Sequence, residues 1–137
     1  MIESTVAERR LAFALDASAL LAYLFHEPGA EFVREVLPHS VISTVNWAEV
    51  LQRLRAIGHD PAGLEEDLIF LGLELAPFSA RDAAATASLF LATRSRGLSL
   101  GDRACLALAR SRDMTALTAD RAWLDLGLPD VRVDRIR

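Results

Sequence analysis

The sequence contains no lysine, because all fifteen of its cationic residues are arginines. Phosphate-binding loops of the Walker type need a lysine at a fixed position, and enzymes that form a Schiff base need a lysine amine. Both classes are therefore excluded. A GC-rich coding sequence is the simplest explanation of the bias, and the two exclusions hold whatever its origin.

Cysteine and histidine are also scarce. Cys105 is the only cysteine, so the chain has no disulfide framework and no cysteine-rich zinc site. The three histidines, His26, His39 and His59, are far apart and lack the spacing of metal ligands. We therefore expect the histidines to be structural or exposed. Cys105 lies among small apolar residues, and we expect it to be buried.

Long apolar runs and excess positive charge are absent as well. No uninterrupted apolar run reaches the roughly 18 residues that a membrane-spanning helix needs. The apolar stretch after Arg9 and Arg10 has Asp16 at its centre, which argues against a secretory signal. The net charge of −4 gives no broad basic face, so a nucleic-acid role would rest on a local site. We expect a cytoplasmic protein with no membrane association.

The remaining composition is that of an ordinary globular protein. The chain has 137 residues, of which 52% are hydrophobic and 25% charged, and this fits one domain. Residues 1–10 are polar and unpatterned, so we predict a flexible N-terminal extension followed by one domain over residues 11–137. Short apolar runs alternate with helical patterns along this domain. That order predicts an α/β fold with a mostly parallel twisted sheet of four to five strands flanked by helices.

Apolar periodicity, caps and breakers place the individual elements. Strands are predicted at 11–15, 40–45, 73–78, 114–119 and 131–136, the last as an edge strand. Helices are predicted at 18–25, 30–37, 46–58, 61–72, 79–96, 99–112 and 120–126. Trp47, Phe90 and Trp123 fall within helical apolar patterns, and we expect all three in the core.

Four carboxylates stand just after predicted strands or in the first turn of predicted helices, namely Asp16, Glu49, Asp102 and Asp120. Because sites of open α/β sheets lie beyond the carboxyl ends of the strands, we expect these acids to share one cleft. Like charges about 4 Å apart repel by ~1 kcal/mol in water and by ~4 kcal/mol at an effective dielectric near 20, so the cluster needs a cation. Oxygen ligands favour one or two Mg²⁺ or Mn²⁺ ions, which suit hydrolysis of a phosphodiester.

Each acid also has a local structural explanation. Asp102 could complete a capping box, and Asp16 and Asp120 could each cap the helix that follows. Glu49 stands four residues before Arg53, in the favourable orientation for a surface ion pair. Taken one at a time, these explanations compete with a shared site.

Asp82 provides an internal control for the capping explanation. It follows Ser79 by three residues, which is the spacing that separates Asp102 from Ser99. Both pairs therefore have the pattern of a capping box. We predict no catalytic role for Asp82.

The segments that carry the acids resemble the PIN-domain family, and in particular the VapC toxins of bacterial toxin–antitoxin pairs. The similar segments are LDASALLAYLFHEPG (15–29), STVNWAEVL (43–51), LSLGDRACLALA (98–109) and ALTADRAW (116–123). The resemblance implies that the four acids are catalytic and hold the metal. It also implies that Ser18, Asn46 and Thr118 hydrogen-bond the acids or metal-bound water.

The resemblance extends over residues 11 to about 136 and carries further expectations. It implies Mg²⁺- or Mn²⁺-dependent cleavage of RNA, a homodimer, and a small VapB-like antitoxin that binds across the active-site groove. Arg94 and Arg96 shortly precede Asp102 and are our candidates for contacts with RNA phosphates. The alternative for these two arginines is stabilisation of a helix C-terminus.

Other functions are alternatives to this hypothesis. A PIN-like protein could bind RNA or a protein partner without cleaving, and an RNA-maturation nuclease would have the same site. A receiver domain needs a lysine and an early acidic pair, and a haloacid-dehalogenase-like phosphatase needs a second Asp where Ser18 stands. The chain has neither set of residues, so a metal-dependent endoribonuclease remains the primary hypothesis.

Overall fold

The computed structural model describes residues 12–123 and 125–137, so the extension predicted for residues 1–10 lies outside the described residues. A five-stranded sheet with the order β3-β2-β1-β4-β5 forms the centre of the fold. All four pairings between neighbouring strands are parallel, which confirms the predicted α/β class. The strands are β1 (Phe13–Leu15), β2 (Ser40–Ser43), β3 (Glu74–Ala76), β4 (Thr115–Thr118) and β5 (Arg132–Arg135).

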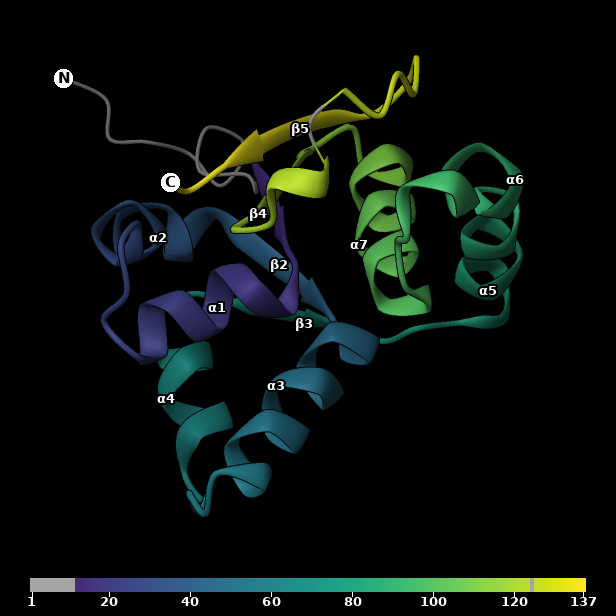
Figure 1. Cartoon of the computed structure of the whole chain (residues 1–137). Coiled ribbons are helices and arrows are strands. Elements are labelled where there is room, and N and C mark those ends of the chain that lie inside the picture. Colours follow the sequence, from purple (N-terminus) through teal and green to yellow (C-terminus); the bar gives the residue numbers. More distant parts are fainter. Residues whose placement is uncertain (1–11, 124) are drawn as a thin grey trace, which may run out of the picture.

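Helices connect the strands and pack on both faces of the sheet (Figure 1). One face is covered by α1 (Ala17–Leu24), α2 (Ala30–Val36), α3 (Thr44–Ala56) and α4 (Leu64–Phe70). The other face is covered by α7 (Leu100–Ser111), and α5 (Ala80–Ala87) packs against α7. The short helix α6 (Phe90–Thr93) follows α5 in the chain. Short 3-10 turns are η1 (Leu37–His39), η2 (Arg94–Arg96) and η3 (Arg121–Trp123). Throughout the described part of the chain, every helix is too short or too polar to cross a membrane.

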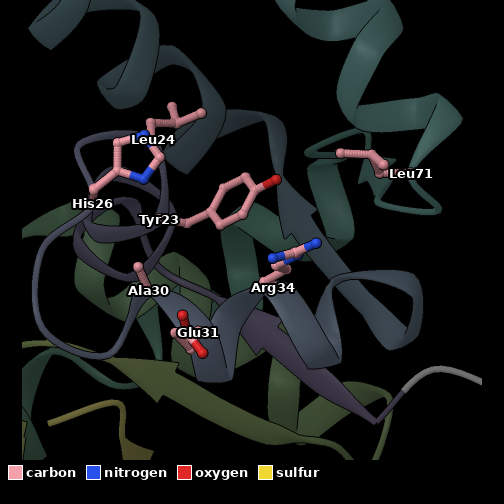
Figure 2. Close-up of a pocket in the computed structure, with 7 residues that line it drawn as sticks. All are labelled: Tyr23, Leu24, His26, Ala30, Glu31, Arg34 and Leu71. Atoms are coloured by element: carbon pink, nitrogen blue, oxygen red, sulfur yellow. The ribbon is translucent and has the colours of Figure 1, made fainter.

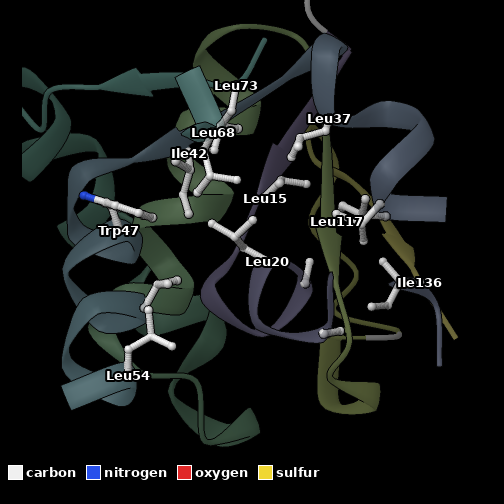
Figure 3. Packing of buried hydrophobic residues seen from close by; sticks show 14 residues of the cluster. Leu15, Leu20, Leu37, Ile42, Trp47, Leu54, Leu68, Leu73, Leu117 and Ile136 are labelled. Atoms are coloured by element: carbon white, nitrogen blue, oxygen red, sulfur yellow. The ribbon is translucent and has the colours of Figure 1, made fainter. Parts of the chain in front are cut away.

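Side chains point alternately to the two faces of the three central strands, and this divides the core into two layers. Leu15, Ile42 and Leu117 point to the face of α1 to α4, where they pack with Leu20 and other apolar residues (Figure 3). All three strand residues are fully buried. Because successive side chains of a strand point to opposite faces, their neighbours must face the second layer.

The second layer is built from smaller side chains. Ala14, Val41 and Ala116 precede the three large residues in their strands and are fully buried beneath α7. Their small size lets α7 approach the sheet closely, and the Sγ atom of Cys105 lies 3.5 Å from the carbonyl oxygen of Ala14. Cys105 is fully buried as predicted, and this burial raises the pKa of its thiol.

The strand register brings three chain segments to one edge of the sheet. Leu15 at the end of β1 lies beside Ile42 of β2 and Leu117 of β4. The strands β2 and β3 are added on one side of β1, and β4 and β5 on the other. Open α/β sheets bind ligands beyond the carboxyl ends of the strands at such a reversal of order. The residues just after β1 and β4 therefore occupy the usual position of a site.

Two helix starts differ from the prediction because of capping. Asp16 is the N-cap of α1, since its side chain accepts a hydrogen bond from the Ala19 amide, and the helix begins at Ala17 and not at residue 18. Ser43, the last residue of β2, caps α3, which therefore begins before Asn46. In both places a polar residue at the end of the strand caps the helix, so each helix begins earlier than predicted.

The single helix predicted for residues 79–96 is in fact interrupted. The Ser88 hydroxyl donates to the Ala85 carbonyl at 2.6 Å, and the Thr93 hydroxyl donates to the Leu89 carbonyl at 2.7 Å. Such side-chain bonds compete with the helical backbone ladder. After the break Leu89 faces the core, whereas Phe90 is 47% exposed, so its predicted core position was wrong. The guanidinium carbon of Arg103 lies 4.8 Å from the centroid of the Phe90 ring.

The helix predicted for residues 61–72 begins later than expected, at Leu64. Asp60 accepts a hydrogen bond from the Ala62 amide at 3.0 Å, which forms a local turn and not a helix cap. Gly63 then adopts a left-handed conformation with φ 84°, and α4 starts after it. Trp47 and Trp123 are both buried in the core, as predicted.

Candidate active site

A hollow of about 280 Å³ lies at the carboxyl edge of the sheet, and all four predicted acids line it. We name this hollow the acidic cleft. Its lining residues are Asp16, Ala17, Ser18, Leu21, Glu49, Arg53, Asp102 and Asp120. Four chain segments that are far apart in sequence thus place carboxylates in one small space, as the positions after the strands led us to expect.

Asp16 lies at the end of β1 and is only 3% exposed. The Ser18 hydroxyl donates to both of its carboxylate oxygens, at 2.8 and 2.9 Å. The Thr118 hydroxyl donates to Oδ2 at 2.6 Å, and the Ala19 amide donates to Oδ1 at 2.8 Å. These bonds hold the carboxylate in one orientation, and Ser18 and Thr118 occupy the supporting positions that the resemblance implied.

The environment of Asp16 raises its pKa from 3.8 to about 6. Burial is the main cause, because it disfavours the charged form. The hydrogen bonds from Thr118, Ala19 and Ser18 act in the opposite direction, and the nearby charge of Asp102 adds to the increase. The fold therefore keeps a carboxylate where its negative charge is poorly compensated by protein groups.

Glu49 lies on α3, which packs against both α1 and α7, and it lines the cleft. Asn46 Nδ2 donates to Glu49 Oε1 at 2.9 Å and to the carbonyl oxygen of Gly101 at 3.0 Å. The pKa of Glu49 is raised, first by burial and also by the charge of Asp102, while the bond from Asn46 opposes the increase. Asn46 thus connects α3 to the first turn of α7 and fixes the position of Glu49.

Asp102 and Asp120 both have the capping roles that were considered as alternatives. Asp102 forms a complete capping box with Ser99 at the start of α7. Asp120 accepts a hydrogen bond from the Ala122 amide at 2.9 Å, and its own amide donates to Thr118 Oγ1 at 3.0 Å. Each cap uses only part of the capacity of its carboxylate to accept bonds, since a carboxylate has about four acceptor positions. Capping and membership of the cleft are therefore compatible.

The donor set of the cleft fits a hard divalent cation. Within residues 12–123 and 125–137, no three Asp, Glu, His or Cys side chains are close enough to surround an ion directly. Mg²⁺ commonly uses one or two carboxylates and keeps several waters, so a wider arrangement suits it. Asn46 Oδ1 is buried without a hydrogen-bond partner, although Asn46 Nδ2 has two. A water held by an ion would provide the donor that this oxygen lacks.

Positive charge reaches the cleft through Arg53, whose role the sequence analysis missed. Arg53 lies one helical turn after Glu49 and is the cationic member of the residues that line the cleft in the described structure. It also lines an adjoining hollow with Glu49, Gln52 and Ala56. The i,i+4 spacing was the available signal, but it was interpreted only as a surface ion pair.

Arg94 and Arg96 are not among the residues that line the cleft. Both lie in η2, and Arg96 donates to the carbonyl oxygen of Asp125 at 2.7 Å, which connects η2 to the loop after Asp120. Contact of these two arginines with RNA phosphates stays a prediction.

A larger hollow of about 520 Å³ lies between α1, α2 and the residue after α4 (Figure 2). Its lining residues are Tyr23, Leu24, His26, Ala30, Glu31, Arg34 and Leu71. None of the four acids contributes to it. Its size exceeds that of the acidic cleft, but it lacks the convergent carboxylates that would support chemistry. We therefore assign the candidate active site to the acidic cleft.

Comparison with known proteins agrees with this fold. Residues 13–127 match the family model of the PIN domain. A DNA-bound VapBC complex from Salmonella typhimurium contains a chain that is 17% identical, with TM-score 0.70, and the match covers 93% of this chain and 99% of that one. A chain of a toxin–antitoxin complex from Klebsiella pneumoniae is 18% identical with TM-score 0.68, and the match covers 92% of this chain and 98% of that one. A chain of VapBC2 from Rickettsia felis, bound to promoter DNA, is 19% identical with TM-score 0.67, and the match covers 91% of this chain and 98% of that one. Curated proteins gave no match by sequence.

Proposed function

The chain belongs to the PIN-domain family, and we propose that it is a metal-dependent endoribonuclease of the VapC toxin type. One observation carries this proposal: Asp16, Glu49, Asp102 and Asp120 line a single cleft at the carboxyl edge of the sheet. A divalent Mg²⁺ or Mn²⁺ ion held there, alone or as one of two, would activate water and stabilise the leaving oxygen of a phosphodiester. These four acids are the proposed catalytic residues and would hold the ion, in part through its bound waters.

The protein groups around the acids have distinct roles in this proposal. Ser18 and Thr118 orient Asp16 through hydrogen bonds, and Asn46 orients Glu49. Fixing carboxylates in this way is the usual contribution of residues behind a metal site. Arg53 supplies the positive charge that would attract a phosphate of the substrate to an otherwise acidic cleft.

The test is cleavage of total RNA by the purified chain, with the cut sites mapped. We expect cleavage with Mg²⁺ or Mn²⁺, none in excess EDTA, and none with Asp16→Asn. Robust cleavage in EDTA would contradict the metal-dependent mechanism. An inert wild type that still binds RNA would indicate a non-cleaving binding module, and cuts confined to precursor ends would indicate a maturation nuclease.

We further propose a VapB-like antitoxin as protein partner, a homodimer, and action in the cytoplasm. The support for the antitoxin comes from the similar structures, which are complexes of toxins with antitoxins. Phe70 is 89% exposed at the end of α4, and Ile69 and Leu71 beside it are also exposed. An exposed apolar patch of this kind is typical of a protein-binding surface.

The partner proposal is tested with the protein encoded by a short reading frame beside the gene. That protein is expected to co-purify with the chain and to stop RNA cleavage when added in equal amount. A chain that cleaves RNA but is neither bound nor inhibited by this protein would remove the toxin assignment and leave the nuclease assignment intact.

A further inference from the structure

Gly101 occupies a position in α7 where glycine has no evident backbone reason. It lies in the first turn of the helix, between Leu100 and Asp102. It is not among the glycines with positive φ, so its backbone conformation is open to any residue. Glycine in a helix is destabilising relative to alanine, because it loses more conformational freedom on folding. The glycine therefore calls for an explanation outside the backbone.

The explanation lies in the space above Gly101, which the Glu49 carboxylate fills. A Cβ atom added to Gly101 would lie 2.7 Å from both Cδ and Oε2 of Glu49, and closer still to Oε1. Real Cβ atoms essentially never come within 3.0 Å of another heavy atom. Because the three nearest atoms all belong to Glu49, the closest clash would be with this carboxylate.

A hydrogen bond from Asn46 holds the carboxylate in this position. Its Nδ2 donates to the carbonyl oxygen of Gly101 and to Glu49 Oε1 together. Asn46 is 1% exposed and lies within the packed contact between α3 and α7. The carboxylate is thus held against the bare Cα of Gly101, directly beside Asp102 in sequence.

We propose that Gly101 is a positioning residue, whose missing side chain lets Glu49 lie beside Asp102 in the acidic cleft. The inference rests on the proposed metal-dependent nuclease function. Gly101 itself contacts neither ion nor substrate and acts only through Glu49. A methyl group at this position would leave the helix intact but would displace the Glu49 carboxylate from the acidic cleft.

The test is the substitution Gly101→Ala. Without metal, the urea midpoint of the variant is expected to equal or exceed that of wild type, because alanine favours the helix. The Mg²⁺ concentration for half-maximal cleavage should rise roughly 10- to 100-fold, as for loss of a group that orients a metal ligand. KM for RNA should stay unchanged, and saturating Mg²⁺ should restore part of the lost rate. A merely structural defect would show neither the unchanged KM nor the rescue.

Ser111→Ala is the matched control. Ser111 is exposed at the far end of the same helix, so this change favours the helix without affecting the cleft. We expect wild-type Mg²⁺ requirement and rate. A crystal structure of Gly101→Ala should have the Glu49 carboxylate displaced and the α7 backbone in place.

Two results would overturn the inference while the proposed function stands. One is a Gly101→Ala variant with the Mg²⁺ requirement of wild type. The other is a variant markedly less stable than wild type in urea, since the added methyl group would then strain the backbone packing. If the wild type itself shows neither Mg²⁺-dependent cleavage nor stabilisation by Mg²⁺, the proposed function fails and this inference fails with it.

Discussion

The starts of α5 and α7 are the same local motif in two surroundings. At α5, the Asp82 carboxylate accepts the Ser79 amide at 2.8 Å, and at α7 the Asp102 carboxylate accepts the Ser99 amide at 2.8 Å. In both cases the serine hydroxyl accepts the aspartate amide in return. Local sequence and local hydrogen bonding therefore do not distinguish the two aspartates.

The surroundings do distinguish them. The start of α7 lies against α3, and Asp102 lines the acidic cleft and raises the pKa of both Asp16 and Glu49. Asp82 lines no part of this cleft. A capping box is thus determined by a few neighbouring residues, whereas membership of the site is determined by which helix start the sheet topology places at the carboxyl edge.

The largest expected difference between the two helix starts is in cleavage. Asp102→Asn should lower the rate by roughly 100-fold or more, because several kcal/mol of transition-state stabilisation depend on the ion and its ligands. Asp82→Asn should cleave as wild type, although it loses the same capping carboxylate. The measurement is single-turnover cleavage of a labelled RNA. Equal losses in both variants would mean that Asp102 acts only as a helix cap.

The second difference concerns stability against pH in metal-free protein. Below its usual pKa of 3.8, Asp16 is protonated in both the folded and the unfolded chain, so no charge is buried on folding. Between 3.8 and about 6 the unfolded chain ionises first, and the wild type loses stability as pH rises. Asp16→Asn avoids this loss, so from pH 4 to 7 it should gain about 2 kcal/mol relative to wild type.

Urea unfolding at several pH values measures this gain, with Asp82→Asn as the control that should run parallel to wild type. A constant difference between Asp16→Asn and wild type from pH 4 to 7 would contradict the raised pKa. Strong destabilisation of Asp16→Asn at pH 7 would show that its capping bonds matter more than the cost of its buried charge.

Mg²⁺ should separate the same variants by their melting temperature. An ion that binds only the folded chain stabilises it by about 2.7 kcal/mol at 100 times its Kd. Wild type and Asp82→Asn should show the full shift, and Asp16→Asn and Asp102→Asn a much smaller one. Calorimetry with and without Mg²⁺ makes the comparison. Equal shifts in all four proteins would place the ion elsewhere.

Much of the fold and of the cleft was accessible from the sequence because short-range rules apply there. The central strands are short apolar runs that are buried on both faces, and an acid follows β1 and β4 within two residues of the strand end. The general rule for parallel sheets then brings those acids together. The order of the segments was enough, although several helix boundaries were misplaced.

The missed features depend on contacts between distant segments or on competing local bonds. The need for glycine at position 101 appears only once α3 places Glu49 above it. The break before α6 depends on whether Ser88 and Thr93 bond back to the helix, which residue type alone does not decide. Phe90 follows that break and is 47% exposed, whereas its neighbour Leu89 is buried, which the apolar pattern did not indicate.

The smallest expected effect concerns Arg53, which lines the cleft that Arg94 and Arg96 do not reach. Arg53→Ala should raise KM for RNA roughly tenfold, the scale of one charge-assisted hydrogen bond to a phosphate. The slope of log affinity for RNA against log salt concentration should also become less steep by about 0.7, as expected for the loss of one phosphate contact with a single strand. Arg55→Ala, an exposed change on the same helix, should leave both quantities unchanged. Larger effects from Arg94→Ala or Arg96→Ala would move the path of the RNA from α3 to η2.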